Sequence, residues 1–230
     1  MQKKLGDCME VYENKQDYAY NALKRLILTC ELKPNEKISR KDLAEELHVG
    51  NTPIREAILR LEREGLFHTV PQSGTFVTTL NKMKIKESFF IRKNIEKKVF
   101  EDFFKIATKQ QVKELEKMLV IQRLVFDSND FEMLFNFDDQ FHKFFYKITE
   151  KEFTWTWVAT VSGTLQRGKF LQFEDEESSW HKIQTDHENI VKALKNRDKE
   201  KYDQLVSEHL DSLKPDINQI LKKHPEYFDK

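Results

Sequence analysis

Between positions 42 and 65, hydrophobic and polar residues alternate with the period of two short amphipathic helices. On the first helix, Leu43, Ala44 and Leu47 fall on one side. On the second, apolar residues recur at helical spacing from Ile54 to Leu61, and charged residues fill the opposite side. The pattern predicts that each helix buries one face in a shared core.

The residues between these two helices predict a tight turn. Gly50 is able to adopt the positive φ that such turns need. We expect Thr52 to cap the second helix and Pro53 to take its first position, where a missing N–H costs nothing. This arrangement is typical of a helix-turn-helix, whose second helix places its N-terminal end in the major groove. DNA is therefore the leading expected partner.

Further elements flank the helix pair. Residues 17–31 predict a preceding helix, and the polar residues 1–14 predict a poorly ordered tail. Residues 66–80 alternate in a strand-like way around a turn at 71–74, which predicts a two-stranded hairpin. A hairpin behind a helix-turn-helix is a wing, so residues 1–80 are expected to form a winged helix-turn-helix DNA-binding domain.

The rest of the chain, residues 81–230, predicts an antiparallel all-α bundle, because Gly and Pro are rare there and the connections are short. The fold class is thus mainly α, with the domain boundary between residues 79 and 84. Six helices are expected, near 83–107, 109–127, 130–149, 152–173, 179–196 and 199–221.

Charge and cysteine content add only a little to what is expected of the protein's partners and location. The net charge is zero, and residues 1–80 carry twelve basic and twelve acidic side chains, so a DNA-binding surface has to be a local patch. This balance predicts modest non-specific binding and a shallow salt dependence. Cys8 and Cys30 have no metal-type spacing and are expected to stay reduced. With no apolar run long enough to cross a membrane, we expect a cytoplasmic protein with no membrane partner.

Four polar residues interrupt the apolar stripes of the predicted bundle. Asp138 and His142 lie four residues apart on one helix face, and His187 and His209 occupy core positions on two other helices. Because buried polar groups need partners, these residues could hold a divalent first-row metal ion. The alternative is a hydrogen-bonded Asp–His pair with two satisfied core histidines, which the spacing alone favours.

The first bundle helix also places Arg92 and Glu96 on its inner face. An inward arginine is suited to gripping a carboxylate through two parallel hydrogen bonds. An internal Arg92–Glu96 pair four residues apart explains the same pattern. The sequence leaves both interpretations open.

These motifs together resemble a known family over residues 17–221. The segments ELKPNEKIS, LAEELHVGNTPIREAILRLEREGLF and PQSGTFV are similar to the winged helix-turn-helix of the GntR superfamily of bacterial transcription regulators. The pattern Asp138-x-x-Phe-His142, the later His187, the pair His209-Leu210 and the Arg92-x-x-x-Glu96 motif resemble the FCD effector domain of its FadR-like branch. The bundle looks like the shorter, six-helix variety of that domain.

The resemblance implies a homodimeric, ligand-responsive regulator that reads a pseudo-palindromic operator in double-stranded DNA, with repression as the commoner direction. It implies a metal site, with zinc as the first candidate and nickel or manganese as others, and a small carboxylate effector gripped by Arg92. The implied metal ligands are Asp138, His142, His187 and His209. The expected DNA contacts come from Arg40, Lys41, Asn51, Thr52, Arg55 and Gln72.

The sequence departs from the family at two places. Gly50-Asn51 stands where the family has Ser-Arg, which affects operator sequence or affinity, and Glu150-Lys151 replaces a frequent Gly-Asn. Two rival functions remain at this stage. A metalloenzyme would need a general base, for which Glu96 is the available inward carboxylate. Alternatively, the metal is structural or is itself the sensed signal.

Overall fold

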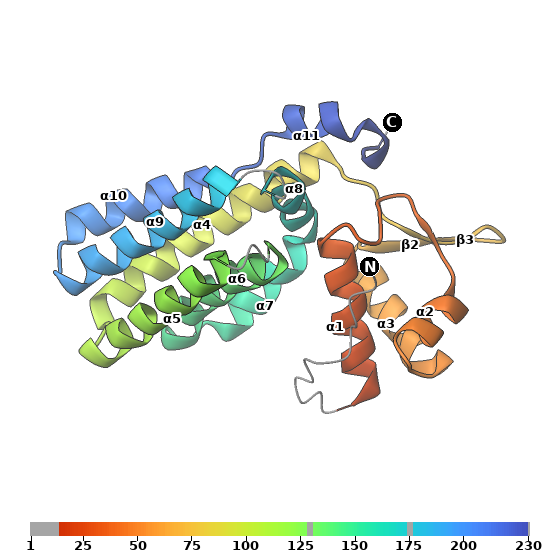
Figure 1. Cartoon of the computed structure of the whole chain (residues 1–230), viewed down its shortest axis with the longest axis horizontal. Helices are drawn as coiled ribbons and strands as arrows, with labels where there is room; N and C mark the ends of the chain where they lie inside the picture. Colours follow the sequence, from red (N-terminus) through yellow and green to blue (C-terminus); the bar gives the residue numbers. More distant parts are fainter. Residues whose placement is uncertain (1–13, 128–130, 174–176, 230) are drawn as a thin grey trace. The chain divides into compact units, whose positions relative to one another are not determined.

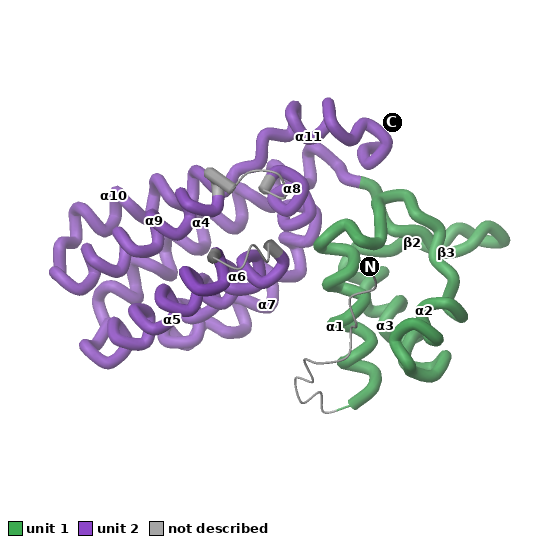
Figure 2. Tube along the Cα trace, in the orientation of Figure 1, with its two compact units in different colours: residues 1–79 green, residues 80–230 purple. Residues whose placement is uncertain are grey.

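The computed structural model describes residues 14–127, 131–173 and 177–229. The chain divides into two compact units, residues 1–79 and 80–230 (Figures 1 and 2). Residues 1–13, 128–129 and 174–176, for which the sequence predicted a tail and two loops, lie outside the described residues. No described helix is long and apolar enough to cross a lipid bilayer.

The first unit combines helices with a small antiparallel sheet (Figure 1). Its strands lie in the order β1-β3-β2, and β2 and β3 are the predicted hairpin. The two-residue strand β1 pairs with β3 and was not predicted, because two residues are too few to show an alternating pattern. The elements are α1 (Lys15–Leu28), β1 (Lys37–Ile38), α2 (Arg40–Glu46), α3 (Asn51–Arg63), β2 (Phe67–Val70) and β3 (Gly74–Val77).

The predicted faces of α2 and α3 are buried together with α1. Leu43 and Leu47 on α2, Ile54 and Leu61 on α3, and Leu23 on α1 all belong to one core. The helix that was predicted over 17–31 begins earlier and ends at Leu28. The core of this unit is therefore the three-helix packing on which a helix-turn-helix depends.

The turn between α2 and α3 differs from the prediction. The positive φ falls on His48 (52°) and not on Gly50, because α2 ends with the Val49 N–H bonded to the carbonyl of Ala44, which requires a left-handed residue just before Val49. Gly50 has an extended backbone and is itself the N-cap of α3. Thr52 is therefore the second helical residue and not the cap, since glycine is an accepted residue at that position.

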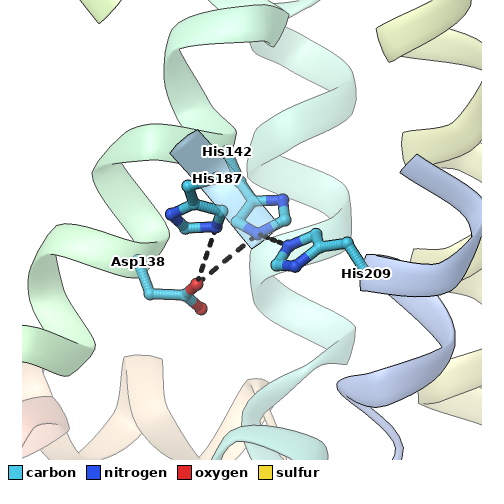
Figure 3. A group of neighbouring side chains, drawn as sticks. All are labelled: Asp138, His142, His187 and His209. Atoms are coloured by element: carbon cyan, nitrogen blue, oxygen red, sulfur yellow. Dashed lines mark hydrogen bonds and ion pairs between the residues drawn. The ribbon is translucent and has the colours of Figure 1, made fainter. Parts of the chain in front are cut away.

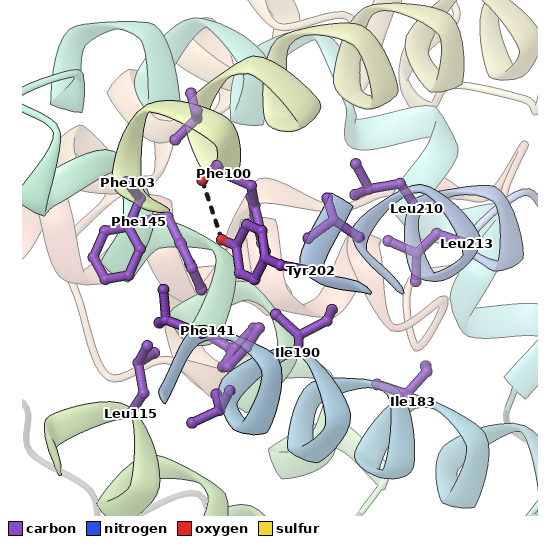
Figure 4. Packing of buried hydrophobic residues seen from close by; sticks show 14 of the residues in the cluster. Phe100, Phe103, Leu115, Phe141, Phe145, Ile183, Ile190, Tyr202, Leu210 and Leu213 are labelled. Atoms are coloured by element: carbon purple, nitrogen blue, oxygen red, sulfur yellow. Dashed lines mark hydrogen bonds between the residues drawn. The ribbon is translucent and has the colours of Figure 1, made fainter. Parts of the chain in front are cut away.

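The second unit is an α-helical bundle with a core rich in phenylalanine (Figure 4). Phe100 and Phe145 stack with ring centroids 3.9 Å apart, and the Tyr202 hydroxyl donates to the carbonyl of Phe100 over 3.1 Å. The helices are α4 (Lys82–Ile106), α5 (Lys109–Asp127), α6 (Phe131–Ile148), α7 (Glu152–Val161), α8 (Gly163–Phe173), α9 (Glu177–Lys195), α10 (Lys199–Ser212) and α11 (Ile217–Lys223).

Two of the six predicted helices are each divided in two. The segment predicted as one helix over 152–173 breaks at Ser162, next to Gly163, whose helix propensity is poor. The segment predicted over 199–221 ends at Ser212 and resumes at Ile217. Pro215 lies in this gap, where its missing N–H and its constraint on the preceding residue end a helix.

Candidate metal centre and DNA-binding helix

Four polar side chains meet in the core of the bundle (Figure 3). Asp138 and His142 come from α6, His187 from α9 and His209 from α10, and each is buried. One ligand atom from each residue lies within 4.8 Å of all the others. The Nε2 atoms of His142 and His209 are 3.2 Å apart, and Asp138 Oδ1 is 3.6 Å from Nε2 of both His142 and His187.

The outer nitrogens of two imidazole rings have acceptors that fix their orientation. His142 Nδ1 lies 2.8 Å from Glu96 Oε2, and His187 Nδ1 lies 3.1 Å from Gln122 Oε1. An acceptor at Nδ1 keeps the ring proton there and leaves the Nε2 lone pair directed at the centre. The His187 contact is a hydrogen bond, whereas the His142 contact is an ion pair in which neither Nδ1 nor Glu96 Oε2 makes a hydrogen bond within the described part of the chain. Both contacts favour a proton on Nδ1 and a free Nε2 lone pair, the form in which imidazole binds a metal.

The third ring has a similar but longer contact. His209 Nδ1 lies 3.6 Å from Asp186 Oδ2, on the adjacent helix α9. Asp186 also accepts from Lys182, so its carboxylate is held from two sides. Burial raises the pKa of Asp186, but the contacts with His209 and Lys182 outweigh it and leave the pKa below its ordinary value. The carboxylate is therefore ionised and able to accept from His209.

Asp138 is held from outside by Lys169, a residue that the sequence analysis missed. Lys169 Nζ donates to Asp138 Oδ2 over 3.0 Å, and the lysine side chain is only 1% exposed. The break at Ser162 changes the phase of the helical pattern, so a single helix over 152–173 concealed the inward direction of Lys169. The signal in the sequence is a lysine whose neighbours in α8, Gly168 and Phe170, are both uncharged.

The electrostatics of the centre favour an ionised carboxylate and two neutral rings. Burial opposes the charge on Asp138, but Lys169 and His142 outweigh it and hold the pKa of this carboxyl well below its usual range. Burial lowers the pKa of His187 far below its ordinary value, and burial likewise lowers the pKa of His209. Neutral imidazoles and a carboxylate are the forms that bind metals. Burial opposes the charge on the third ring, His142, but Glu96 and Asp138 outweigh it and raise the pKa of His142 above its ordinary value, so a metal has to displace a proton there.

Two inward atoms have no partner of their own. Among the described residues, Asp138 Oδ1 and His187 Nε2 are buried and make no hydrogen bond. Buried polar atoms in native structures normally have a partner, so each such atom needs an explanation. A divalent ion bound to Oδ1 and to the three Nε2 atoms would satisfy both, and this donor set suits a first-row metal. The residues therefore fit a metal.

Arg92, the predicted effector-binding residue, is fully engaged inside the protein. Its Nε donates to Glu96 Oε1 over 2.7 Å, which is the internal pair that the sequence left open, and a terminal nitrogen lies 3.4 Å from Asp139 Oδ1. Gln166 Nε2 donates to the other oxygen of Asp139 over 2.7 Å. Burial opposes the charge on Glu96, but Arg92 and His142 lower its pKa to about 2. Glu96 therefore lies between Arg92 and His142 and contacts both.

The predicted DNA contacts all lie on the surface of the first unit. Asn51, Thr52 and Arg55 are exposed in the N-terminal half of α3, the part of a recognition helix that meets base edges. The other three predicted residues are also exposed: Arg40 and Lys41 begin α2, and Gln72 lies in the turn between β2 and β3 with a φ of 61°.

A winged helix-turn-helix followed by an all-helical unit with a buried polar centre defines a class of DNA-binding regulators with a ligand-sensing domain. Two family models place the chain within that class. The model for bacterial regulatory proteins of the gntR family matches residues 15–77, and the model for the FCD domain matches residues 87–212. The chain belongs to the GntR family of bacterial transcription regulators and carries an FCD effector-binding domain.

Individual relatives agree with this assignment. The HTH-type transcriptional repressor RspR of Escherichia coli K12 is 27% identical over 209 residues, which cover 91% of each chain. The gluconate operon transcriptional repressor of Bacillus subtilis is 24% identical and covers 83% of this chain and 82% of its own. The solved structure of E. coli McbR/YncC shares the fold, with a TM-score of 0.78, 22% identity and coverage of 92% and 99%. These relatives are transcription regulators, so the metalloenzyme alternative is rejected.

The buried contacts of Glu96 with Arg92 and His142 predict that removing the charge of Glu96 strongly destabilises the protein. We expect Glu96→Gln to lower the free energy of unfolding by about 3 kcal/mol or more, because it leaves a buried arginine without its main partner. The matched control is Glu101→Gln on the same helix, whose solvent-exposed pair with Lys105 should contribute far less to the free energy of unfolding. Urea unfolding of chelator-treated protein measures both, and equal losses for the two variants would contradict the network.

Proposed function

We propose that this protein is a homodimeric transcription repressor whose FCD domain binds a divalent metal ion and, next to it, a small carboxylate effector. The observation that carries the proposal is the centre formed by Asp138 and three histidines, in which each ligand is also contacted from outside by a polar side chain. Histidines that gather in a core by chance are not expected to have a polar side chain against the outer side of each ring.

Asp138 Oδ1 and the Nε2 atoms of His142, His187 and His209 would hold the metal. Zinc is the first candidate because it prefers nitrogen and oxygen ligands of this kind, and nickel and manganese accept the same donors. When bound, the ion supplies a positive centre to which a carboxylate oxygen can bind. The protein's own residues set which anion fits beside it.

Arg92 is the residue that would bind the far end of the effector. Its contact with Asp139 is longer than its contact with Glu96, so an incoming carboxylate would replace Asp139 and leave the Glu96 pair intact. The raised pKa of Asp139, which burial causes, makes that carboxylate the weaker competitor. One relative is named the gluconate operon transcriptional repressor, and gluconate is a small carboxylate.

On DNA, Arg55, Asn51 and Thr52 would contact bases and adjacent phosphates from the recognition helix. Arg40 and Lys41 would hold phosphates, and Gln72 would touch the duplex from the tip of the wing. Two copies would read a pseudo-palindromic operator, and the protein would act in the cytoplasm. Effector binding can change DNA affinity only if two arrangements of the dimer bind the effector differently, typically by about 1–3 kcal/mol.

The outer face of α7 is the surface that we assign to the second copy. Phe153 and Trp157 are 77% and 60% exposed on one side of the helix, and no charged residue occurs from 153 to 166. The hydroxyls of Thr156 and Thr160 on this side donate to their own helix carbonyls and so leave their methyl groups outward. A charge-free apolar face suits pairing with itself about a two-fold axis. The two aromatic rings offer roughly 300 Å² toward the about 800 Å² that each partner of a standard dimer buries.

The metal site predicts a simple stoichiometry. Protein purified without a chelator or a His tag should contain about one zinc, nickel or manganese ion per chain, and His142→Ala should lose most of it, because the substitution removes one of the four ligands together with the contact to Glu96 that orients it. His181→Ala is the matched control, since this exposed histidine of α9 lies against the Phe126 ring and is not one of the four clustered residues. Elemental analysis measures all three proteins, and metal retained by His142→Ala would refute the site.

The recognition helix predicts a strong dependence on one arginine. Arg55→Ala should weaken binding by about 10- to 100-fold to a duplex that the wild-type protein has selected from a random pool, because each good base contact contributes roughly 1–3 kcal/mol. Arg63→Ala, exposed at the C-terminal end of the same helix, should bind as the wild type does. Fluorescence anisotropy at fixed salt gives the three affinities, and equal affinities would contradict the assignment of α3.

If the outer face of α7 forms the dimer, placing charges on it should halve the mass of the protein in solution. The double variant Phe153→Glu and Trp157→Glu should give a monomer of 27.6 kDa, whereas the wild type should have twice that mass. Val120→Glu with Leu124→Glu is the control, because these side chains of α5 are equally exposed, at 62% and 65%. Light scattering after gel filtration gives the masses. A monomeric wild type, or a dimer lost only in the α5 variant, would show that α7 is not the interface.

A further inference from the structure

Lys169 is a charged side chain in an unusual position. Its side chain is 1% exposed, its ammonium lies 3.0 Å from Asp138 Oδ2, and it sits 5.6 Å from the centre of the Phe135 ring. Lysine is almost never fully buried unless it is paired, because the desolvation of an ammonium is expensive. The side chain therefore has a specific electrostatic role in the core.

The two oxygens of Asp138 face different partners. Oδ2 accepts from Lys169, while Oδ1 points at the histidine nitrogens and makes no hydrogen bond among the described residues. The positive charge of Lys169 balances the carboxylate without occupying the oxygen that a metal would use. Arg92, another buried cation of this unit, is engaged by Glu96 and Asp139. Asp138 thus has a cation of its own within the chain.

We propose that Lys169 is a resident counter-ion of Asp138, which keeps the bundle folded without metal and weakens metal binding enough for the ion to exchange. A carboxylate buried without a cation would destabilise the metal-free protein, and Lys169 removes that cost. The same ammonium repels a dication bound on the other side of the carboxylate. The site then binds its metal reversibly, and the fold does not require the metal. This inference rests on the metal site proposed above.

The test compares Lys169→Met, which keeps the length and packing of the side chain, with the wild type. In metal-free protein, the variant should melt roughly 10 °C lower, because one partner of a buried pair is gone. Its zinc affinity, measured by competition with a chromophoric chelator, should rise by about tenfold or more, because a repelling charge has been removed. Lys195→Met, which removes an exposed pair with Glu116, should change neither quantity.

Two further variants separate the proposed role from a packing role. Lys169→Arg keeps the charge and should retain the melting temperature and moderate zinc affinity of the wild type better than Lys169→Met does. In an Asp138→Asn background, Lys169→Met should no longer lower the melting temperature, because the pair no longer exists. That double-mutant cycle keeps the test usable if Lys169→Met folds poorly with Asp138 present.

The outcomes distinguish this inference from the proposed function. Unchanged or weaker zinc binding by Lys169→Met, or a wild type that is unfolded without metal, would overturn the counter-ion role. A folded wild type that takes up no zinc would instead show that the metal site is wrong. Coupling between Lys169 and Asp138 in the double-mutant cycle would then report only a structural ion pair.

Discussion

The charge on Asp138, placed in the middle of a helical core, constrains the whole second unit. A buried carboxylate is costly unless cations and hydrogen-bond donors surround it, so its neighbours are fixed by that requirement. Lys169 holds one oxygen, and the other faces three imidazole nitrogens. Those rings are in turn contacted by Glu96, Gln122 and Asp186. The arrangement thus extends from one charged group to side chains on α4, α5, α8, α9 and α10.

This network connects the centre to the helix that follows the DNA-binding unit in the chain. α4 begins at Lys82, three residues after the first unit ends, and it carries both Arg92 and Glu96. Glu96 pairs with Arg92 through one oxygen and lies against His142 with the other. Through these contacts, α4 is the helix on which a change in the charge of His142 would act first. Regulation by a ligand requires such an element, because its position has to depend on whether the ligand is bound.

Much of the fold was predictable from the sequence. The mainly α fold class, the helix-turn-helix faces and the wing hairpin are confirmed, because helical and strand periodicities report which residues are buried. The helix breaks at Ser162 and near Pro215 and the left-handed His48 were missed. Gly163 and Pro215 disfavour a helix at the two breaks, but a long helical pattern on both sides concealed them. The conformation of His48 depends on how the end of α2 is capped, which single-residue preferences describe poorly.

The candidate site was also predictable only in part, because its central residues could be found from the sequence and their partners could not. Asp138 and the three histidines stand out because they interrupt apolar stripes, and the structure gathers them within a few ångströms. Their outer partners do not stand out. Gln122 and Asp186 look like ordinary polar residues of a helix surface, and Lys169 lies beyond an unpredicted helix break. Which polar residues contact one another across helices depends on packing between segments far apart in the sequence.

The most direct test of the account is X-ray absorption at the zinc edge of the zinc-loaded full-length protein. The account predicts a first shell of nitrogen and oxygen at about 2.0–2.2 Å, with the outer-shell scattering of three imidazoles and no sulfur. Zinc–sulfur scattering at about 2.3 Å would place the ion on a cysteine. That result, or a shell with fewer than two imidazoles, would contradict a metal centre built on Asp138, His142, His187 and His209.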